Sequence, residues 1–216
     1  MLSDICYLKN MQVIRELDKN VIDALQSGQV LVYPTETCYG LGGDATNSDV
    51  VEKIYKIKQR LEEKPFLVVV PDVAMAMEYL EWGPQLDEIA SRYWPGPLTV
   101  VGGVRLSEFG VRNLANGVVA PDGTIAVRVT AHPVAAELAR ALGRPLISTS
   151  ANISGREPSY SADDIIKMFE GRENQPDILI DCGVLFQNPP TTIVSIVGGE
   201  IEVLRKGSVE VDVWGE

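Results

Sequence analysis

The stretch from Gln29 to Ile57, QVLVYPTETCYGLGGDATNSDVVEKIYKI, decides the fold class of this 216-residue chain. It begins with an apolar run, Gln29–Tyr33, that predicts a strand, and it ends with Ser48–Ile57, where apolar residues recur at helical spacing. The segment between them, Pro34–Asn47, is rich in Gly and Thr and has no period. A strand, a polar loop and a helix in this order are typical of α/β proteins, which place ligands in such loops.

The remainder of the chain continues this alternation of helical and extended patterns. We predict helices over Met11–Ser27, Val73–Leu80, Leu86–Tyr93, Pro133–Leu142 and Ser161–Glu170. We predict strands over Phe66–Val70, Leu98–Val104, Thr124–Val129, Pro145–Ser148, Ile178–Ile180, Thr192–Val197 and Ile201–Leu204. Because Gly198-Gly199 between the last two runs favours a hairpin, we expect a mixed sheet rather than a parallel one.

Length and composition indicate a globular protein with one hydrophobic core. The chain has 45% apolar and 23% charged residues and no long Pro-, Gly- or Ser-rich linker, so we predict a single domain over residues 1–216. Its apolar runs fall well short of the roughly 20 residues that a membrane helix needs, and residues 1–10 lack the apolar segment of a secretory signal. We therefore expect a cytoplasmic protein that does not bind membranes.

The cysteines and the single histidine do not indicate a metal site. Cys6, Cys38 and Cys182 are widely spaced and form no C-x-x-C pair, so we predict no disulfide and no zinc site, and we expect all three to be buried. His132 precedes a predicted helix, and we interpret it as structural. One histidine without a cysteine pair supports neither a Ser-His-Asp triad nor a histidine-rich metal site.

A local basic cluster contrasts with the net charge of the chain. The formal charge of −11 opposes non-specific binding to nucleic acids, so no strong direct contact with them is expected. Between residues 53 and 64, however, five basic and two acidic residues give a charge of +3 (Lys53, Lys56, Lys58, Arg60, Glu62, Glu63, Lys64). Lys58 and Arg60 would point apart on a continuous helix, so they can hold one ligand, such as a triphosphate, only if the helix ends near Ile57. The alternative is a solvated helix face.

Two further segments carry polar groups at strand ends. Ser148–Gly155, STSANISG, follows a predicted strand with hydroxyls, an amide and free backbone N–H groups, which suit an anion or a ribose but also an ordinary turn. Arg128 lies in the apolar strand Thr124–Val129 and needs a carboxylate or phosphate partner, because an unpaired buried charge is costly.

Gly40–Ala45 satisfies the pattern G-x-G-x-x-A and raises the alternative of a dinucleotide-dependent oxidoreductase. In dinucleotide sites the first glycine follows the strand almost at once, whereas six residues, Pro34–Tyr39, intervene here. We therefore do not favour that interpretation. The P-loop pattern G-x-x-x-x-G-K-[ST] is absent from the sequence, so ATP would have to bind in another way.

Six motifs in fixed order resemble those of the YrdC/Sua5 family, also known as the TsaC type of threonylcarbamoyl-AMP synthase. They are PTETCYGLG at 34–42, K-x-R at 58–60, WPGPLT at 94–99, IAVRVTAHP at 125–133, SANISG at 150–155 and PTTIV at 190–194. The resemblance implies a core of about residues 12–207 with a YrdC/RibB-like fold, in which a mixed twisted sheet is flanked by helices around an open basic cavity. Six ordered motifs are far more specific than any one of them.

The resemblance also implies an activity, that of a nucleotidyltransferase. Such an enzyme makes L-threonylcarbamoyladenylate and pyrophosphate from L-threonine, bicarbonate and ATP with Mg²⁺. The product passes to a tRNA threonylcarbamoyl-transferase complex, which modifies adenosine 37 of ANN-decoding tRNAs to t6A. This chain is then not required to bind tRNA, which agrees with its acidity.

The same resemblance implies roles for individual residues. Lys58 and Arg60 are the expected catalytic residues, which neutralise the triphosphate. The threonine ligands are expected to be Thr35, Arg128, Ser148 and Thr191, with Arg128 unpaired within the protein until it meets the carboxylate of threonine. The expected ATP ligands are Lys58, Arg60, Thr124, Ser150, Asn152 and Arg205. No metal-ligating residues are expected, since the phosphates would hold Mg²⁺.

Some positions depart from the family pattern. Leu61 and Thr130 replace prolines, valines stand at 68–70 where some members carry a histidine, and nothing here matches the C-terminal domain of longer Sua5 proteins. One alternative is a YciO-like paralogue that binds RNA or nucleotides with weak or no synthase activity, although the intact Ser150-Ala151-Asn152 argues against it. A carbamoyl-adenylate domain of hydrogenase maturation proteins is disfavoured, because those domains lie in much larger chains.

Overall fold

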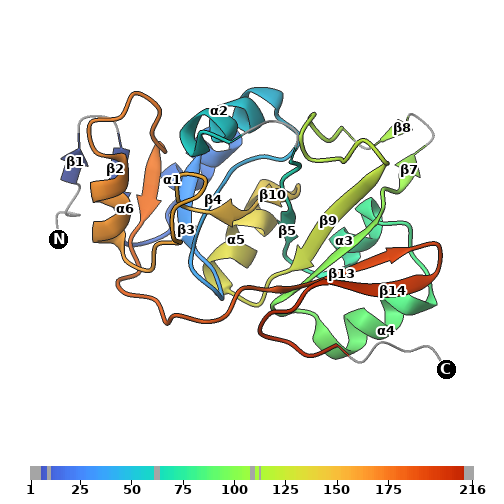
Figure 1. The fold of residues 1–216 in the computed structure, drawn as a ribbon. Helices are drawn as coiled ribbons and strands as arrows, with labels where there is room; N and C mark the ends of the chain where they lie inside the picture. The colour runs from blue at the N-terminus through green and yellow to red at the C-terminus, as the bar shows by residue number, and fades with distance from the viewer. Residues whose placement is uncertain (1–5, 9–10, 61–63, 108–109, 112, 212–216) are drawn as a thin grey trace.

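A computed structural model describes residues 6–8, 11–60, 64–107, 110–111 and 113–211 (Figure 1). Its helices are α1 (Lys19–Gln26), α2 (Ser48–Lys58), α3 (Val73–Tyr79), α4 (Pro84–Tyr93), α5 (Pro133–Leu142) and α6 (Ala162–Phe169). Its strands are β1 (Cys6–Leu8), β2 (Met11–Ile14), β3 (Leu31–Pro34), β4 (Tyr39–Gly42), β5 (Val68–Val70), β6 (Leu98–Gly103), β7 (Leu106–Ser107), β8 (Gly110–Val111), β9 (Thr124–Val129), β10 (Leu146–Ile147), β11 (Thr149–Ser150), β12 (Ile178–Ile180), β13 (Thr192–Val197) and β14 (Glu200–Arg205).

The longer strands form two six-stranded sheets. Sheet A has the order β1-β2-β12-β3-β4-β11, and sheet B has the order β10-β5-β9-β6-β13-β14. Both contain parallel and antiparallel pairs, such as β12 with β3 and β3 with β4, so the predicted mixed α/β fold is confirmed. The division into two sheets was not apparent from the sequence. The chain passes from sheet B to sheet A at Ser148, between β10 and β11.

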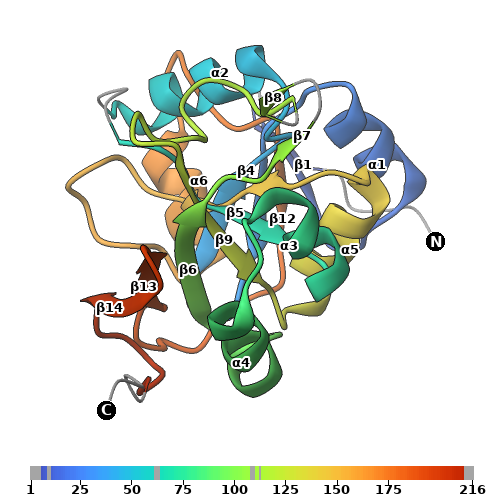
Figure 2. The same cartoon turned by 90° about the vertical axis from the view of Figure 1, so that its right-hand side faces the viewer.

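The alternation of side chains along β9 gives sheet B two different faces. Ile125, Val127 and Val129 are buried in the main hydrophobic core, on the side where α3 packs against β5 and β9 (Figure 2). Ala126 and Arg128 point to the opposite face and line a cavity. The apolar face of β9 packs in the hydrophobic core, and its opposite face is available to bind a ligand.

Most predicted elements agree with the structure to within one or two residues, but two predictions were wrong. Met11–Ile14 is strand β2 rather than the start of a helix, and it pairs in parallel with β12. A short apolar run fits both periods, and Asp18, whose side chain caps α1, marks the true helix start. Strand β4 was missed, because its glycines resemble a loop.

The glycines of β4 also exclude the dinucleotide alternative. A Cβ at Gly42 would lie 1.7 Å from the carbonyl oxygen of Ile147, so only glycine fits where the two segments meet. Gly40 and Gly42 therefore lie within a strand and do not open a helix around a pyrophosphate.

We expected all three cysteines to be buried, and the structure describes the side chains of two of them. Cys38 is buried as predicted, but Cys182 is exposed, in the connection between β12 and β13. The Cys6 side chain and Leu61 lie outside the described part of the structure. No helix in that part is long and apolar enough to cross a membrane.

Candidate active site

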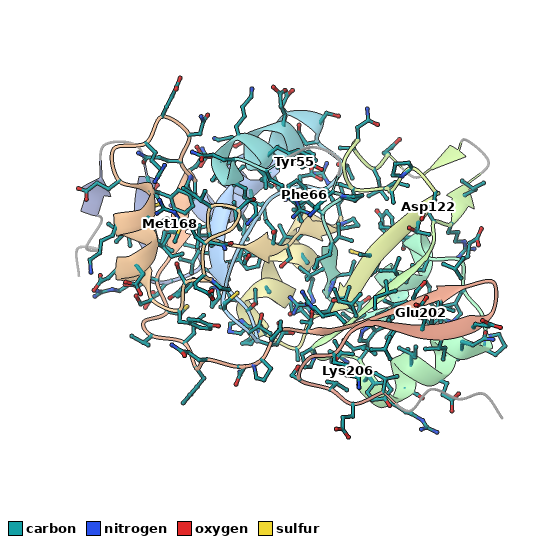
Figure 3. All side chains as sticks on the ribbon, viewed as in Figure 1. Tyr55, Phe66, Asp122, Met168, Glu202 and Lys206 are labelled. Carbon is teal, nitrogen blue, oxygen red and sulfur yellow. The ribbon has the colours of Figure 1, made fainter. Side chains whose placement is uncertain are left out.

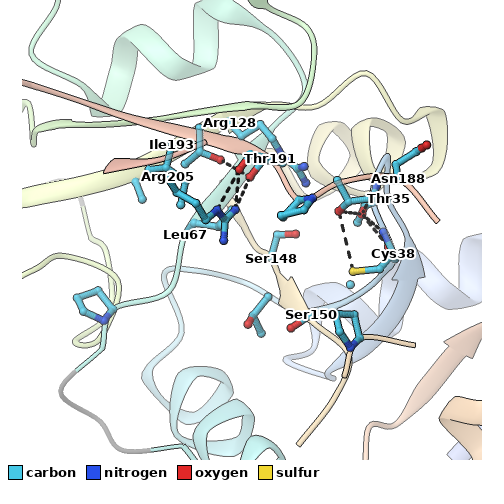
Figure 4. Close-up of a pocket in the computed structure, with 18 of the residues that line it drawn as sticks. Thr35, Cys38, Leu67, Arg128, Ser148, Ser150, Asn188, Thr191, Ile193 and Arg205 are labelled. Carbon is cyan, nitrogen blue, oxygen red and sulfur yellow. Dashed lines mark hydrogen bonds between the residues drawn. The ribbon is translucent and has the colours of Figure 1, made fainter. Parts of the chain in front are cut away.

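A cavity of about 650 Å³ lies between the two sheets, within the roughly 300–1,000 Å³ typical of small-molecule sites (Figure 4). Its lining comes from the predicted motifs and from segments between them. The lining residues are Thr35, Thr37, Cys38, Gly40, Arg60, Pro65, Leu67, Thr99, Val101, Ala126, Arg128, Ser148, Thr149, Ser150, Glu157, Pro158, Tyr160, Asn188, Pro190, Thr191, Ile193 and Arg205. Three arginines and one glutamate make this surface basic in an acidic chain, as expected.

Sheet B forms one wall of the cavity. β6, β9 and β13 contribute Thr99 and Val101, Ala126 and Arg128, and Ile193, each from the face opposite to the core. Small and β-branched residues on this face leave room for a ligand. The wall ends at Arg205 of the edge strand β14, which pairs with Ile193.

Arg205 donates hydrogen bonds to Thr191, another residue of the cavity lining. Its Nε and Nη2 donate to the carbonyl oxygen of Thr191 at 3.0 and 2.8 Å, and Nη2 also donates to Thr191 Oγ1 at 2.9 Å (Figure 4). The hydroxyls of Thr191 and Thr99 are 3.3 Å apart. Arg205 thus fixes the Thr191 hydroxyl that we expected to contact threonine.

The opposite wall is the turn between β3 and β4. Thr35 Oγ1 donates to the carbonyl oxygen of Cys38 at 2.7 Å, which closes the turn. Ser148 and Ser150 lie beside it at the junction of the two sheets. Four residues expected to bind threonine, namely Thr35, Arg128, Ser148 and Thr191, therefore line one cavity.

Arg128 is not unpaired, and that prediction was wrong. Its Nη1 lies 3.3 Å from Glu36 Oε2, and the side chains of Arg128 and Glu36 are only 3% and 14% exposed. Burial raises the pKa of Glu36, but Arg128 and the hydrogen bonds from Thr130 and Ala131 outweigh it, so this pKa lies below its usual value. The partner that a buried arginine needs is thus supplied by the polar loop itself.

Lys58 is the last residue of α2, one position beyond the predicted helix end, but it does not line the cavity. Only 3% exposed, it donates from Nζ to Ser150 O at 2.5 Å, to Asn152 O at 3.0 Å and to Asn152 Oδ1 at 3.2 Å. Burial, followed by the charge of Arg60, lowers the pKa of Lys58 to about 8. All three donors of an ammonium group are therefore in use within the protein.

Arg60 lines the cavity alone, whereas we expected Lys58 and Arg60 to line it together. Gln59 leaves the helix in a left-handed conformation, with φ of 51°, and this change of direction separates Arg60 from Lys58. Arg60 Nη2 donates to Pro65 O at 3.1 Å, and its guanidinium carbon lies 4.8 Å from the centroid of Phe66. Phe66 in turn packs on Tyr55, as Figure 3 shows.

Asn152 and Thr124, two residues expected to bind ATP, lie outside the lining. Asn152 is buried, accepts from Ser150 Oγ at 2.6 Å and donates to Arg156 O, so it shapes the turn that presents Ser150. Thr124 Oγ1 donates to Asp122 Oδ1 at 2.7 Å. Neither side chain is free for a ligand in this structure.

Residues that the sequence did not single out also line or support the cavity. For Glu36 the signal was only general, because a buried arginine requires an acidic partner but the polar loop contains two acidic residues, Glu36 and Asp44. Glu157, Tyr160 and Asn188 had no such signal, since they lie in irregular segments that only the tertiary fold brings to the site. Among the described residues, no three His, Cys, Asp or Glu side chains gather as a metal site.

The model of the family Sua5_yciO_yrdC, described as telomere recombination, matches residues 23–207. The chain belongs to this family. The match includes every candidate site residue discussed above. It agrees with the resemblance drawn from the six motifs, although the family includes Sua5, YciO and YrdC members alike.

Solved structures of relatives share the fold. Sua5 of P. abyssi, crystallised with L-threonine, is 29% identical with a TM-score of 0.76 over 91% of this chain and 57% of its own. E. coli YciO is 25% identical with a TM-score of 0.74 over 93% and 96%. MTH1692 of Methanobacterium thermoautotrophicum is 27% identical with a TM-score of 0.63 over 94% and 98%. The chain thus spans little more than half of the Sua5 protein and nearly all of the other two.

Proposed function

We propose that this chain is an L-threonylcarbamoyladenylate synthase, which uses L-threonine, bicarbonate and ATP. The observation that carries the proposal is the convergence of Thr35, Arg128, Ser148 and Thr191 with Arg60 and Ser150 on one basic cavity. All of them except Ser148 come from five separate motifs. A cavity in which Arg128 can bind a carboxylate and Arg60 can bind phosphates suits an amino acid and a nucleotide together. Membership of the family and the likeness to a Sua5 structure with L-threonine support the same function.

The proposed chemistry has two steps. The amine of threonine combines with bicarbonate to form a carbamate and water. A carbamate oxygen then attacks the α-phosphorus of ATP, the bond to the β-phosphate oxygen breaks, and pyrophosphate leaves. The reaction is thus the transfer of an adenylyl group, and the protein contributes position and charge rather than a nucleophile.

In this scheme Arg128 binds the carboxylate of threonine, while Thr35, Ser148 and Thr191 supply hydroxyls around it. Arg60 faces the phosphates, and its charge stabilises the negative charge that grows on the leaving pyrophosphate.

Ser150 is a further phosphate ligand, supported by Asn152 and Lys58 from behind. Mg²⁺, held by the phosphates, would further neutralise the leaving group. We propose that a tRNA threonylcarbamoyl-transferase complex consumes the product.

Pyrophosphate release measured with each component omitted tests the proposal. We expect release only when ATP, bicarbonate and threonine are all present, and threonylcarbamoyl-AMP should appear in equal amount by mass spectrometry. Release that is indifferent to threonine would overturn the proposal.

A second candidate is a nucleotide- or RNA-binding module like YciO. It is favoured by the near-complete mutual coverage of this chain and E. coli YciO. That candidate predicts RNA affinity that falls steeply with salt, without pyrophosphate release. The same preparation can be tested for both properties.

A further inference from the structure

Three buried polar atoms without a hydrogen-bond partner belong to neighbouring side chains beside the cavity. Among the residues that the structure describes, the buried side-chain nitrogen and oxygen atoms left without such a partner are Glu36 Oε2, Arg128 Nε and His132 Nδ1. Buried polar groups are almost always paired, because leaving one unpaired is costly. Their occurrence in one cluster indicates that the cluster is arranged for more than the stability of the fold.

The two oxygens of Glu36 have different surroundings. Oε1 accepts hydrogen bonds from Thr130 Oγ1 at 2.8 Å and from the backbone N–H of Ala131 at 2.7 Å. Oε2 accepts none and faces Arg128 Nη1 at 3.3 Å. The first oxygen therefore holds the carboxylate in place, and the second is left to act on the guanidinium.

Glu36 also connects three segments around the cavity. It lies between Thr35 and Thr37, which both line the cavity, and its side chain is tied to the end of β9. Its carbonyl oxygen accepts from Asn188 Nδ2 at 2.8 Å, and Asn188 is itself a lining residue. A displacement of Glu36 would thus move the lining on both sides of Arg128.

We propose that Glu36 is the positioning residue of the amino-acid end of the cavity, where its carboxylate holds the Arg128 guanidinium in the orientation that receives the substrate carboxylate. This inference rests on the proposed function for the identity of that substrate. Glu36 balances the charge of a side chain that is only 3% exposed. Arg128 lines the cavity and has a fork of five donors, so it can keep Glu36 at Nη1 and still donate to a second carboxylate.

The variant Glu36→Gln tests the proposal, because its carbonyl can still accept from Thr130 and Ala131 while its amide replaces the charge beside Arg128. We expect the KM for threonine to rise by about tenfold or more, the effect of one charge-assisted hydrogen bond, with kcat at saturating threonine and the KM for ATP nearly unchanged. A threonine KM equal to that of the wild type would overturn the proposal. So would an equal loss in all three parameters, which indicates general damage.

Asp44 provides a matched control on the same chain. Its Oδ1 accepts from Thr46 N and Oγ1 at 2.9 and 2.7 Å, and its Oδ2 pairs with Arg144 Nη1 at 2.9 Å. This buried carboxylate repeats the arrangement of Glu36, but neither it nor Arg144 lines the cavity. Asp44→Asn should therefore lower thermal stability without a selective change in the KM for threonine.

Two further measurements keep the test decisive. If Glu36→Gln does not fold, Thr130→Val removes one of the bonds to Oε1, and the threonine KM should still rise by about two- to fivefold. The side-chain N–H resonance of Arg128 Nε reports its orientation without any substrate, and it should shift or broaden in both variants. An unchanged resonance would refute the positioning role, whereas wild-type protein that neither binds nor uses threonine would refute the proposed function instead.

Discussion

Lys58 and Arg128 are two buried cations beside the cavity, and they differ in how completely the protein satisfies their hydrogen bonds. Behind the proposed nucleotide end of the cavity, Lys58 is 3% exposed and all three of its donors are bonded to protein oxygens. At the proposed amino-acid end, Arg128 is equally buried, but its counter-ion Glu36 lies 3.3 Å away and its Nε has no hydrogen-bond partner. A fully bonded buried charge holds structure together, while a partly bonded one remains available to a ligand. Burial alone does not distinguish these roles, but the bonds of each cation do.

Replacement of Arg128 by Met should have the largest effect. The substrate carboxylate would lose its partner and Glu36 would remain buried without a counter-ion, a cost of about 3–5 kcal/mol. We expect threonine-dependent pyrophosphate release to fall by a factor of about a hundred or more, while ATP binding measured by calorimetry is retained. An equal loss of ATP binding would show that the two ends are not separate sites.

The pH dependence of stability should reveal the cost of burying Lys58. Its pKa falls from 10.5 in the unfolded chain to about 8 in the folded protein, because burial disfavours the charged form. The unfolded chain therefore binds more protons between these values, so stability rises with pH across this window and is lost as the pH falls towards 8. Across this window the free energy of unfolding changes by about 3 kcal/mol because of this one buried group.

Chemical denaturation of wild type and Lys58→Met between pH 7 and 10 measures this contribution of Lys58 to the free energy of unfolding. The wild type should gain stability relative to the variant as the pH rises. Parallel curves would mean that the oxygens of Ser150 and Asn152 hold the lysine charged throughout, with no depressed pKa.

Nucleotides with different numbers of phosphates should separate Lys58 from Arg60. Arg60 lines the cavity, so Arg60→Met should weaken ATP by about ten- to a hundredfold and AMP much less, since its partner would be a terminal phosphate. Lys58 supports the turn that carries Ser150, so Lys58→Met should weaken ATP and AMP by similar factors. If Lys58→Met weakens ATP alone, then Lys58 leaves its protein partners to contact the triphosphate directly.

The sequence predicted which residues lie at the site better than it predicted their ion-pair and hydrogen-bond partners. The otherwise apolar strand predicted over Thr124–Val129 correctly indicated a buried Arg128, because continuously apolar strands are buried on both faces. It could not show that Glu36, 92 positions earlier, would supply the counter-ion, nor that Lys58 would turn to Ser150 and Asn152. Those contacts depend on how two sheets meet, and the apolar pattern does not contain that information. The same gap hid β2, which pairs with the distant strand β12, whereas β4 was hidden by its glycines.

The smallest effect concerns the support of Arg60 by an aromatic ring. Phe66 is almost fully buried, and its ring lies 4.8 Å from the Arg60 guanidinium, an interaction worth about 0.5–1 kcal/mol at a half-exposed site. Phe66→Leu keeps an apolar side chain of similar size, so the KM for ATP should rise by about two- to fivefold, while the KM for threonine stays constant. Ile57→Val, which also removes apolar contacts from the same core, is the control for lost packing. If both variants change the two KM values equally, the ring acts only through the core, and the nucleotide end depends on the bond from Arg60 to Pro65 for its geometry.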